Sequence, residues 1–428
     1  MPKRFLAGVV AIVILAIAGL YVLAYQPSIA PVTAGQRFAA DHVANGAILA
    51  AAGNCAECHT VKGGRPYAGG YPMTTTFGTI YSTNITPDVE TGIGAWSEAA
   101  FRRAMHQGVA RDGSQLFPAF PYDHFTKLSD ADVGALYAYL MTQTPVQAPP
   151  KQGTIPFPLN LRPLQAGWKL LFFKPGRFAP DAAHDAAWNR GAYLAEALGH
   201  CGACHTPRNR FGAEQADHAY AGAPIDGWIA PALTAANPSP VAWSTPELAQ
   251  YLTTGISQYH GTAVGPMSAV VHNGVARLPP TDQAALAVYV ASLGGGAGRL
   301  ARNAAAIAGA DAADAAGWHP HDDYARLFTA ACASCHYRAG SPNPLRPDIG
   351  LNSAANLDEP TNLVRVILYG IGAEQGAPGI VMPGFIGYSN ADVARLAAHI
   401  RKTRTTKPAW TDLERKVAAI RAAGGKES

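Results

Sequence analysis

The sequence predicts an all-α protein of three similar domains in series, preceded by a helix long enough to span a membrane. A C-x-x-C-H motif occurs three times, and each copy ends a short, Ala-rich apolar stretch. Each repeat then closes with an amphipathic helical pattern. The chain also opens with a long uncharged apolar run. The expected units are a membrane anchor or signal segment at 1–28, domains at 33–148, 180–297 and 318–408, and a C-terminal tail at 409–428.

Composition excludes several classes of protein. The 428 residues include 33 basic and 29 acidic residues, a formal net charge of +4 with histidine neutral. This excess is too small to predict a nucleic-acid partner. Only 14% of residues are charged, whereas glycine and proline number 44 and 33. Low charge with many helix breakers favours short helices joined by ordered loops over a coiled coil or a disordered chain.

The N-terminus has the pattern of a membrane-targeting segment. Lys3 and Arg4 precede an apolar run of 21 uncharged residues, Phe5 to Tyr25. A signal peptide needs roughly 7–15 apolar residues and a spanning helix about 20. We therefore expect residues 1–28 to be a membrane anchor, with a long cleaved signal peptide as the alternative. The basic residues place the N-terminus in the cytoplasm and the remainder outside.

The cysteines indicate the cofactor. All six occur in C-x-x-C pairs, and each pair is followed directly by a histidine. C-x-x-C-H is the attachment signature of c-type haem: two thiols bond the two vinyl groups, and the next imidazole binds the iron. The sequence predicts three covalently bound haem c groups. The thioether cysteines are Cys55, Cys58, Cys201, Cys204, Cys332 and Cys335, and the iron ligands are His59, His205 and His336.

Three other interpretations of the cysteines fit less well. Structural zinc would need two C-x-x-C pairs roughly 15–20 residues apart, and these pairs lie much further apart. A thioredoxin-like motif would not recur three times with a histidine behind it. Disulfides suit an exported protein but do not explain the histidines.

The motifs also define a repeat. Cys201 lies 146 residues after Cys55, and Cys332 lies 131 residues after Cys201. Gly46 and Gly191 precede their motifs by nine and ten residues. The closing segments LSDADVGALYAYL, LPPTDQAALAVYVASL and YSNADVARLAAHI read as helices, two of them with Ser129 and Ser389 as start signals. A first helix with the haem motif and a last helix packed across it is the layout of a small cytochrome c domain. We therefore predict three tandem cytochrome c domains.

The two connections differ in composition. The first, residues 144–181, is rich in proline and unusually apolar at Trp168–Phe173. A linker without contacts would be polar, so this segment is expected to pack against a domain, a partner or lipid. The second, residues 294–321, reads as a surface crossing with one helical turn.

A methionine opposite the histidine makes a low-spin electron-transfer haem of raised potential. Met267 lies 62 residues after His205, and Met382 lies 46 residues after His336, each ahead of its closing helix. Both are predicted iron ligands. The matching loop of the first domain, LFPAFPYDHF, has no methionine and offers His124. We take His124 as the candidate sixth ligand of the first haem. Met105, Met73 or an open iron remain alternatives.

Several motifs follow one another between about Gly46 and His399: CAECH, FGTIYSTNITPD, GIGAWS, LFPAFPY, HCGACHTPRN, AGAPIDGW, GPM and VMPGF. In this order they resemble the three-haem cytochrome c subunits of membrane-bound bacterial dehydrogenases for alcohol, gluconate, sorbitol and aldehyde. The resemblance implies that Met267 and Met382 are axial ligands. It departs at Phe120, where many relatives have methionine. The PAFPYDHF version looks more like cytochromes paired with molybdenum-containing aldehyde or N-heterocycle dehydrogenases.

The expected function is an electron relay. The resemblance implies a catalytic subunit of molybdopterin/iron–sulfur, flavin or quinoprotein type that oxidises an aldehyde or alcohol. It further implies ubiquinone or a terminal oxidase as acceptor, in the inner (cytoplasmic) membrane, with the haem domains facing the periplasm. The chain shows no GxGxxG flavin fingerprint after a strand, so we expect no catalysis by this chain alone. A free-standing electron carrier and a peroxidase-like haem enzyme with an open first haem are the alternatives.

Overall fold

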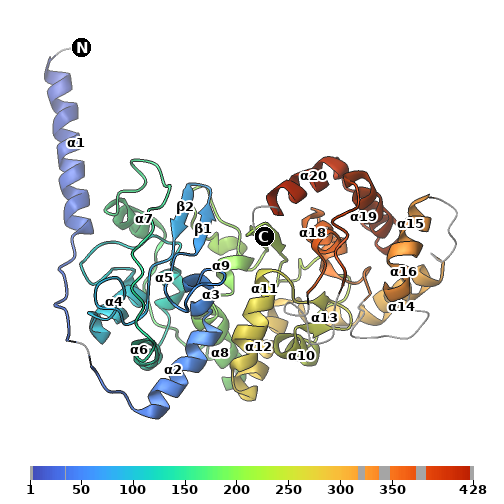
Figure 1. The fold of residues 1–428 in the computed structure, drawn as a ribbon, viewed down its shortest axis with the longest axis horizontal. Helices are drawn as coiled ribbons and strands as arrows, with labels where there is room; N and C mark the ends of the chain where they lie inside the picture. The colour runs from blue at the N-terminus through green and yellow to red at the C-terminus, as the bar shows by residue number, and fades with distance from the viewer. Residues whose placement is uncertain (1–2, 34, 317–322, 337–347, 373–381, 425–428) are drawn as a thin grey trace. The chain divides into compact units, whose positions relative to one another are not determined.

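The computed structural model describes residues 3–33, 35–316, 323–336, 348–372 and 382–424 (Figure 1). The expected start of the third domain at residue 318 lies outside the described residues. The chain divides into two compact units. The first contains Met1–Asp181, Glu196–His200 and Arg210–Ala213, and the second contains Ala182–Ala195, Cys201–Asn209 and Glu214–Ser428.

The first unit contains the first haem motif and the apolar connection. Helix α2 carries the chain into the motif and packs across α6, and α7 contacts α1. The helices are α1 (Lys3–Ala24), α2 (Ala40–Ala52), α3 (Cys55–His59), α4 (Glu98–Gln107), α5 (Tyr122–Phe125), α6 (Asp130–Met141) and α7 (Leu164–Phe172). The strands are β1 (Pro72–Thr75) and β2 (Gly78–Tyr81).

The second unit contains the other two motifs. Its helices begin with α8 (Ala186–Tyr193), which runs into a π-helical turn at Leu194–Leu198, α9 (Gly202–His205), α10 (Thr245–Thr254), α11 (Pro266–Ala269) and α12 (Pro280–Leu293). They continue with α13 (Gly296–Leu300), α14 (Asn303–Ala316), α15 (Asp323–Ala331), α16 (Ala333–His336), α17 (Ser353–Asn356), α18 (Thr361–Tyr369), α19 (Asn390–Arg404) and α20 (Leu413–Gly424). The strands are β3 (Ala223–Ile225), β4 (Trp228–Ala230), β5 (Ile256–Ser257) and β6 (Gly261–Thr262).

The predicted closing helices are confirmed as α6, α12 and α19. The predicted start signals also hold. The Ser129 hydroxyl accepts a bond from the Asp132 N–H at 3.1 Å, and the Ser389 hydroxyl accepts one from the Asp392 N–H at 3.1 Å. Each bond satisfies a backbone donor that a helix start leaves without an intrahelical partner.

The two glycines ahead of the motifs mark the helix crossings. A Cβ atom built on Gly46 of α2 would lie 2.0 Å from the carbonyl oxygen of Ala135 in α6. A Cβ atom on Gly191 of α8 would lie 2.0 Å from the carbonyl oxygen of Ala285 in α12. Backbone therefore meets backbone at both crossings, and only glycine fits there.

A Gly191→Ala variant is expected to be less stable by about 1–3 kcal/mol, because the added methyl group must push α8 away from α12. Urea unfolding of the haem-loaded protein, followed by far-UV circular dichroism, measures this. Gly298→Ala is the control, since a Cβ atom there meets nothing within 4 Å. Equal stability of the two variants would contradict the close crossing.

The prediction of an all-α protein is confirmed as a helix-rich fold of cytochrome c domains, but it missed three two-stranded antiparallel hairpins, β1–β2, β3–β4 and β5–β6. The β3–β4 turn consists of Asp226 and Gly227, with φ angles of 44° and 73°. Two consecutive positive φ angles are typical of a type I′ turn, which Asp-Gly favours. The strands are so short that their alternation is hidden in the sequence.

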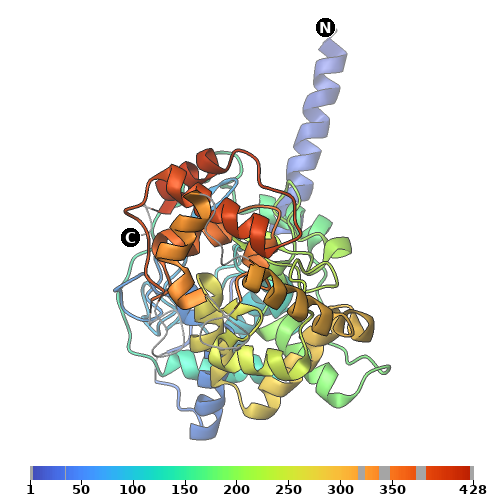
Figure 2. The ribbon, with the colours of Figure 1, turned by 90° about the vertical axis from the view of Figure 1, so that its right-hand side faces the viewer.

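Most of the segment predicted as a C-terminal tail is helical. It contains α20, which packs on α18 and α19 (Figure 2). Trp410 and Val417 lie in the apolar core of the third domain, together with Phe328 and Leu396. The apolar side chains Leu413, Val417 and Ile420 recur at helical spacing and supply the buried face. The second connection was also underestimated, since it contains α13 and the 14-residue α14.

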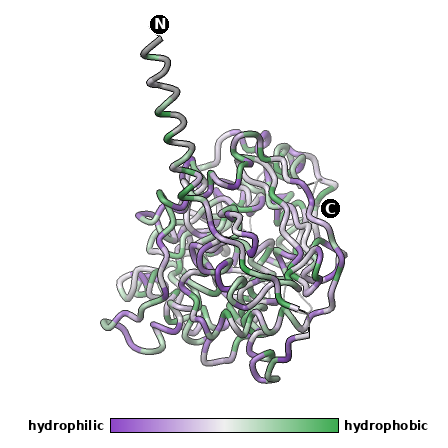
Figure 3. Tube along the Cα trace, turned by 90° about the vertical axis from the view of Figure 1, so that its left-hand side faces the viewer, coloured by the Kyte–Doolittle hydropathy of each residue, from purple (hydrophilic) through white to green (hydrophobic). Residues whose placement is uncertain are grey.

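Among the described residues, no single helix is both long enough and apolar enough to cross a membrane. One pair of helices joined at a bend, Pro280–Leu293 and Gly296–Ala313, has the length and composition of a membrane span. The anchor predicted at residues 1–28 therefore stays a prediction. The segment is helical as α1, and Figure 3 shows green, hydrophobic stretches along its last turns.

Candidate haem sites

The first motif forms the single-turn helix α3. Asn54, with a φ of 52°, breaks the chain direction between α2 and this turn. Cys55 and Cys58 are three residues apart and share one helix face, and His59 follows. The Nδ1 atom of His59 lies 2.6 Å from the carbonyl oxygen of Thr83. A ligating histidine usually makes this bond with the ring nitrogen that does not touch the metal.

The second motif repeats this arrangement. Cys201 and Cys204 flank the start of α9, and the Nδ1 atom of His205 lies 2.7 Å from the carbonyl oxygen of Pro231. Burial lowers the pKa of His205, as it lowers the pKa of His59. Both imidazoles are therefore neutral at pH 7, which is the form that binds iron.

A pair of hydrogen bonds that fixes the loop after each of the first two haem motifs was not predicted from the sequence. We call this arrangement the clamp. The hydroxyls of Thr60 and Thr206 accept bonds from the N–H groups of Tyr67 (3.1 Å) and Tyr220 (3.0 Å). Both tyrosines have left-handed backbone, with φ angles of 61° and 59°. The shared threonine after C-x-x-C-H was visible in the sequence, but the spacing to its tyrosine differs between the repeats.

The same clamp closes on the histidine carbonyls. The N–H groups of Gly69 and Gly222 donate to the carbonyl oxygens of His59 and His205, each at 2.7 Å. Both glycines have positive φ angles, 76° and 89°. The loop after each motif therefore folds back on its histidine in the same way in both domains.

The third motif lies at α16. Cys332 is buried, Cys335 is exposed, and the N–H of His336 donates to the Cys332 carbonyl oxygen at 2.9 Å. Phe328, Cys332 and Ala333 join the core of the third domain. Residues 337–347, which follow the motif, lie outside the described residues.

The residues present fit covalent haem. None of the six cysteines is paired with another in a disulfide. Each pair shares one helical turn with its histidine, and two of the three imidazoles are held at Nδ1 by a carbonyl oxygen. These features match the donor set of a c-type haem.

The loops that could carry a sixth ligand begin at equivalent points. Helices α4, α10 and α18 end at Gly108, Gly255 and Gly370, whose φ angles are 63°, 74° and 72°. The residue twelve positions after each glycine is Phe120, Met267 and Met382 respectively.

The strand pairing supports the match between Phe120 and Met267: Val109 pairs with Gln115 and Ile256 with Thr262, so each of the two residues lies five positions beyond its pair. Met382 itself pairs with Ile371, and residues 373–381 lie outside the described residues, so the match does not extend to the third domain. In the first domain the place of Met267 holds a phenyl ring, which cannot bind iron.

The same alignment bears on Met105. It lies three residues before Gly108, where the second and third domains have Leu252 and Ile367. All three side chains are buried. Met105 thus occupies a core position. Met73 lies in the β1–β2 hairpin, paired with Ile80.

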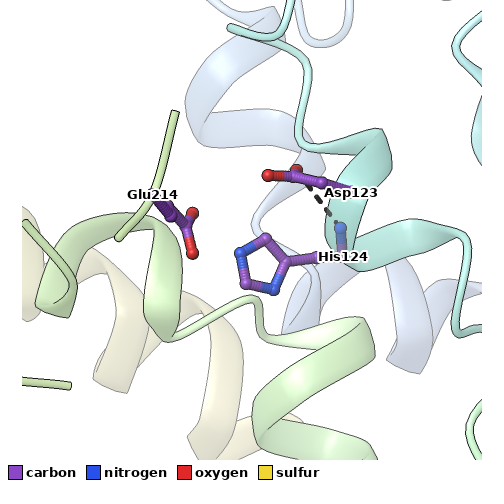
Figure 4. Close-up of side chains that lie close together, drawn as sticks. All are labelled: Asp123, His124 and Glu214. Carbon is purple, nitrogen blue, oxygen red and sulfur yellow. Dashed lines mark hydrogen bonds between the residues drawn. The ribbon is translucent and has the colours of Figure 1, made fainter. Parts of the chain in front are cut away.

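His124 lies on the one-turn helix α5 and is 7% exposed. Figure 4 shows its side chain beside Asp123, whose carboxylate accepts a bond from the His124 backbone N–H at 3.2 Å. The Nδ1 atom of His124 lies 2.8 Å from the carbonyl oxygen of Glu196. The imidazole is therefore held like those of His59 and His205. Its role as an iron ligand stays a prediction.

Comparison with known proteins identifies the family. Residues 43–144 and 324–404 match the cytochrome c family. The chain is 47% identical over 410 residues to a nicotinate dehydrogenase subunit of Pseudomonas putida, covering 94% of this chain and 34% of the relative. It thus spans about a third of that relative's length.

Two further relatives are covered over most of their length. The gluconate 2-dehydrogenase cytochrome c subunit of Pantoea cypripedii is 41% identical over 363 residues, covering 80% of this chain and 81% of the relative. The fructose dehydrogenase cytochrome subunit of Gluconobacter japonicus is 37% identical over 361 residues, covering 80% and 74%. With this identity and coverage, the chain belongs to the cytochrome c subunits of bacterial dehydrogenases.

Proposed function

We propose that this chain is the electron-transfer subunit of a membrane-bound dehydrogenase. It passes electrons from a catalytic subunit through three c-type haems to ubiquinone or a terminal oxidase. The observation that carries the proposal is the threefold C-x-x-C-H motif, with two of its histidines held identically by backbone carbonyls. The names of the relatives support the role, because they are cytochrome subunits of gluconate, fructose and alcohol dehydrogenases.

Each side chain has a defined task in this proposal. A bound haem c supplies an iron centre that takes up and releases one electron. The cysteine pairs hold it covalently, and the carbonyls of Thr83 and Pro231 fix the orientation of His59 and His205. Met267 and Met382 would be the second protein ligands of the second and third haem irons, and their thioether sulfurs would raise the potentials. For the first haem we propose His124, which gives a lower potential because imidazole replaces thioether.

The catalytic partner and the location extend the proposal. The relative that is a nicotinate dehydrogenase subunit favours a partner that oxidises an N-heterocycle. The likeness of the PAFPYDHF segment to cytochromes of molybdenum-containing dehydrogenases favours a molybdenum cofactor in that partner. Lys3 and Arg4 ahead of the apolar run favour anchorage by α1, with the haem domains in the periplasm. Both statements are tested by isolating the native complex.

Purification of the tagged chain from its own membranes is expected to recover a larger catalytic subunit. The denatured chain should retain three haems by mass and by the pyridine haemochrome assay. A Cys201→Ala, Cys204→Ala variant should retain two, which calibrates the count. Two haems or fewer in the unmodified mature chain would overturn the three-haem relay. Recovery of the chain alone would favour a free-standing carrier.

Phe120 favours a second candidate function. If the first iron has no sixth protein ligand, the domain could bind a small substrate there, as a haem enzyme does. Carbon monoxide added to the reduced protein tests this, because it binds rapidly only to an open iron. Spectral change in one haem of three would support the enzyme, and the absence of any change supports the relay.

A further inference from the structure

The first unit exposes an unusual set of large apolar side chains in and before α7. We call it the α7 surface; its members are Phe157, Leu159, Leu161, Leu170 and Leu171. Phe157 is 78% exposed, and Leu170 and Leu171 are each 72% exposed. A soluble domain rarely leaves so many large apolar side chains in water within one short segment, and such surfaces mark interaction sites.

The exposure follows from how α7 is held. The Lys169 ammonium donates to the carbonyl oxygens of Gln107 (2.6 Å) and Gly108 (2.7 Å) and to the side-chain oxygen of Gln115 (2.7 Å). These three bonds turn the Lys169 side of the helix inward. Leu170 and Leu171 follow Lys169 directly and therefore face outward.

Aromatic contacts fix the same orientation. The ring of Phe173 packs edge-on against Tyr122, with centroids 5.1 Å apart. The indole N–H of Trp168 donates to the carbonyl oxygen of Phe211 at 2.9 Å. Helix α7 is thus packed against the first unit by the hydrogen bonds of Lys169 and Trp168. The two leucines face outward as a result of this packing.

The α7 surface adjoins α1. The two helices are in contact, and a Cβ atom on Gly167 of α7 would lie 3.9 Å from a terminal methyl of Leu20 in α1. At this end α1 carries Tyr21, which is 65% exposed, and Tyr25, the residue after its end, is 62% exposed. Tyrosine and tryptophan are enriched at the membrane–water interface. The aromatic residues at this end of α1 and in α7 are therefore those expected at a membrane–water interface.

Charges flank the α7 surface. Lys174 stands two residues after the helix and is exposed. Arg162 stands two residues before it and is also exposed, with one N–H donating to the Gln115 carbonyl oxygen at 3.2 Å and the other N–H groups left for a phosphate. Basic residues at the ends of an amphipathic helix reach the phosphate groups of anionic lipids while the apolar face enters the acyl region. The basic and apolar residues together match a lipid surface better than they match a protein partner.

We propose that the α7 surface lies in the lipid headgroup layer and holds the first cytochrome domain against the membrane. Leu170, Leu171 and Phe157 enter the acyl boundary, and Arg162 and Lys174 contact phosphates. The inference rests on the proposed membrane location. It adds a second contact beyond α1, one that fixes the distance and tilt of the first domain above the bilayer.

Photolabelling tests this contact. The full haem-loaded chain is placed in vesicles of phosphatidylethanolamine and phosphatidylglycerol that contain a diazirine on the acyl chain, and labelled peptides are mapped by mass spectrometry. Label is expected in Lys3–Ala24 and in residues 157–173. Label in Lys3–Ala24 without label in 157–173 would overturn the inference and leave the membrane location standing. Label in neither segment would refute the membrane location itself.

A pair of variants separates lipid from protein as the occupant. Leu170→Gln with Leu171→Gln should lose the label in 157–173 and should leave membranes at a lower detergent concentration. The matched control is Val89→Gln with Ile386→Gln, two exposed apolar residues outside the α7 surface, and it should behave as the unmodified chain. Release of the catalytic subunit by the α7 variant, with unchanged membrane extraction, would assign the surface to that partner and overturn the proposal.

Discussion

A Met267→Ala variant is expected to keep three covalent haems and to lose one His–Met haem. The thioethers do not depend on the sixth ligand, but the potential does. Loss of the methionine sulfur should lower that haem's potential by a few tenths of a volt, within the ~0.8 V range that axial ligands span. Redox titration and near-infrared magnetic circular dichroism measure the two effects. Met382→Ala should give the same result at the third haem.

Met105→Leu is the matched control. Met105 aligns with the buried Leu252 and Ile367, so leucine should fill its place without changing any haem. A lost His–Met signal in Met105→Leu would show that the twelve-residue alignment is wrong for the first domain. An unchanged spectrum in Met267→Ala would show the same for the second.

A His124→Ala variant is expected to convert the first haem from low spin to high spin. In the unmodified chain this haem should show bis-histidine signals by low-temperature electron paramagnetic resonance, at a lower potential than its two His–Met neighbours. Such a centre accepts electrons from a low-potential donor, which suits an iron–sulfur or molybdenum partner. Three His–Met haems, or a high-spin first haem already present in the unmodified chain, would exclude His124 as the ligand.

A second substitution sharpens this test. Phe120→Met in the His124→Ala background should create a third His–Met haem, because residue 120 occupies the place of Met267. His106→Gln serves as control: His106 is also buried in the first domain, and burial lowers its pKa to about 4. It should change neither the spin state nor the potential of the first haem.

Local signals made much of this fold predictable. The haem motifs, the serine-capped starts of α6 and α19, and the glycines at the helix crossings each depend on a few neighbouring residues. These features do not depend on residues far away in the sequence. The close approach of Gly46 to Ala135 could not be predicted as a distance, but a glycine at the same place before two motifs indicated a special role.

Features that depend on tertiary contacts were missed. The tail became α20 because Trp410 and Val417 complete the core of the third domain, and nothing within residues 409–428 indicates that partner. The tyrosine clamp was hidden because Tyr67 and Tyr220 lie at different distances from their motifs. The alignment of Phe120 with Met267 became visible only once the helix ends at Gly108 and Gly255, and the strand pairs behind them, were known.

The equal length of the loops from Gly108 to Phe120 and from Gly255 to Met267, each with a strand pair seven residues after the glycine, constrains how such a protein can evolve. Each inserted or deleted residue moves the chain by up to about 3.3–3.6 Å, more than a metal–ligand bond tolerates. If Met267 binds iron as proposed, changes of length between Gly255 and Met267 would break that bond, whereas changes of side chain keep the loop in place. The first domain has the second kind of change: twelve residues are retained and phenylalanine stands at the end. A duplicated domain can thus acquire a new haem potential by a single substitution.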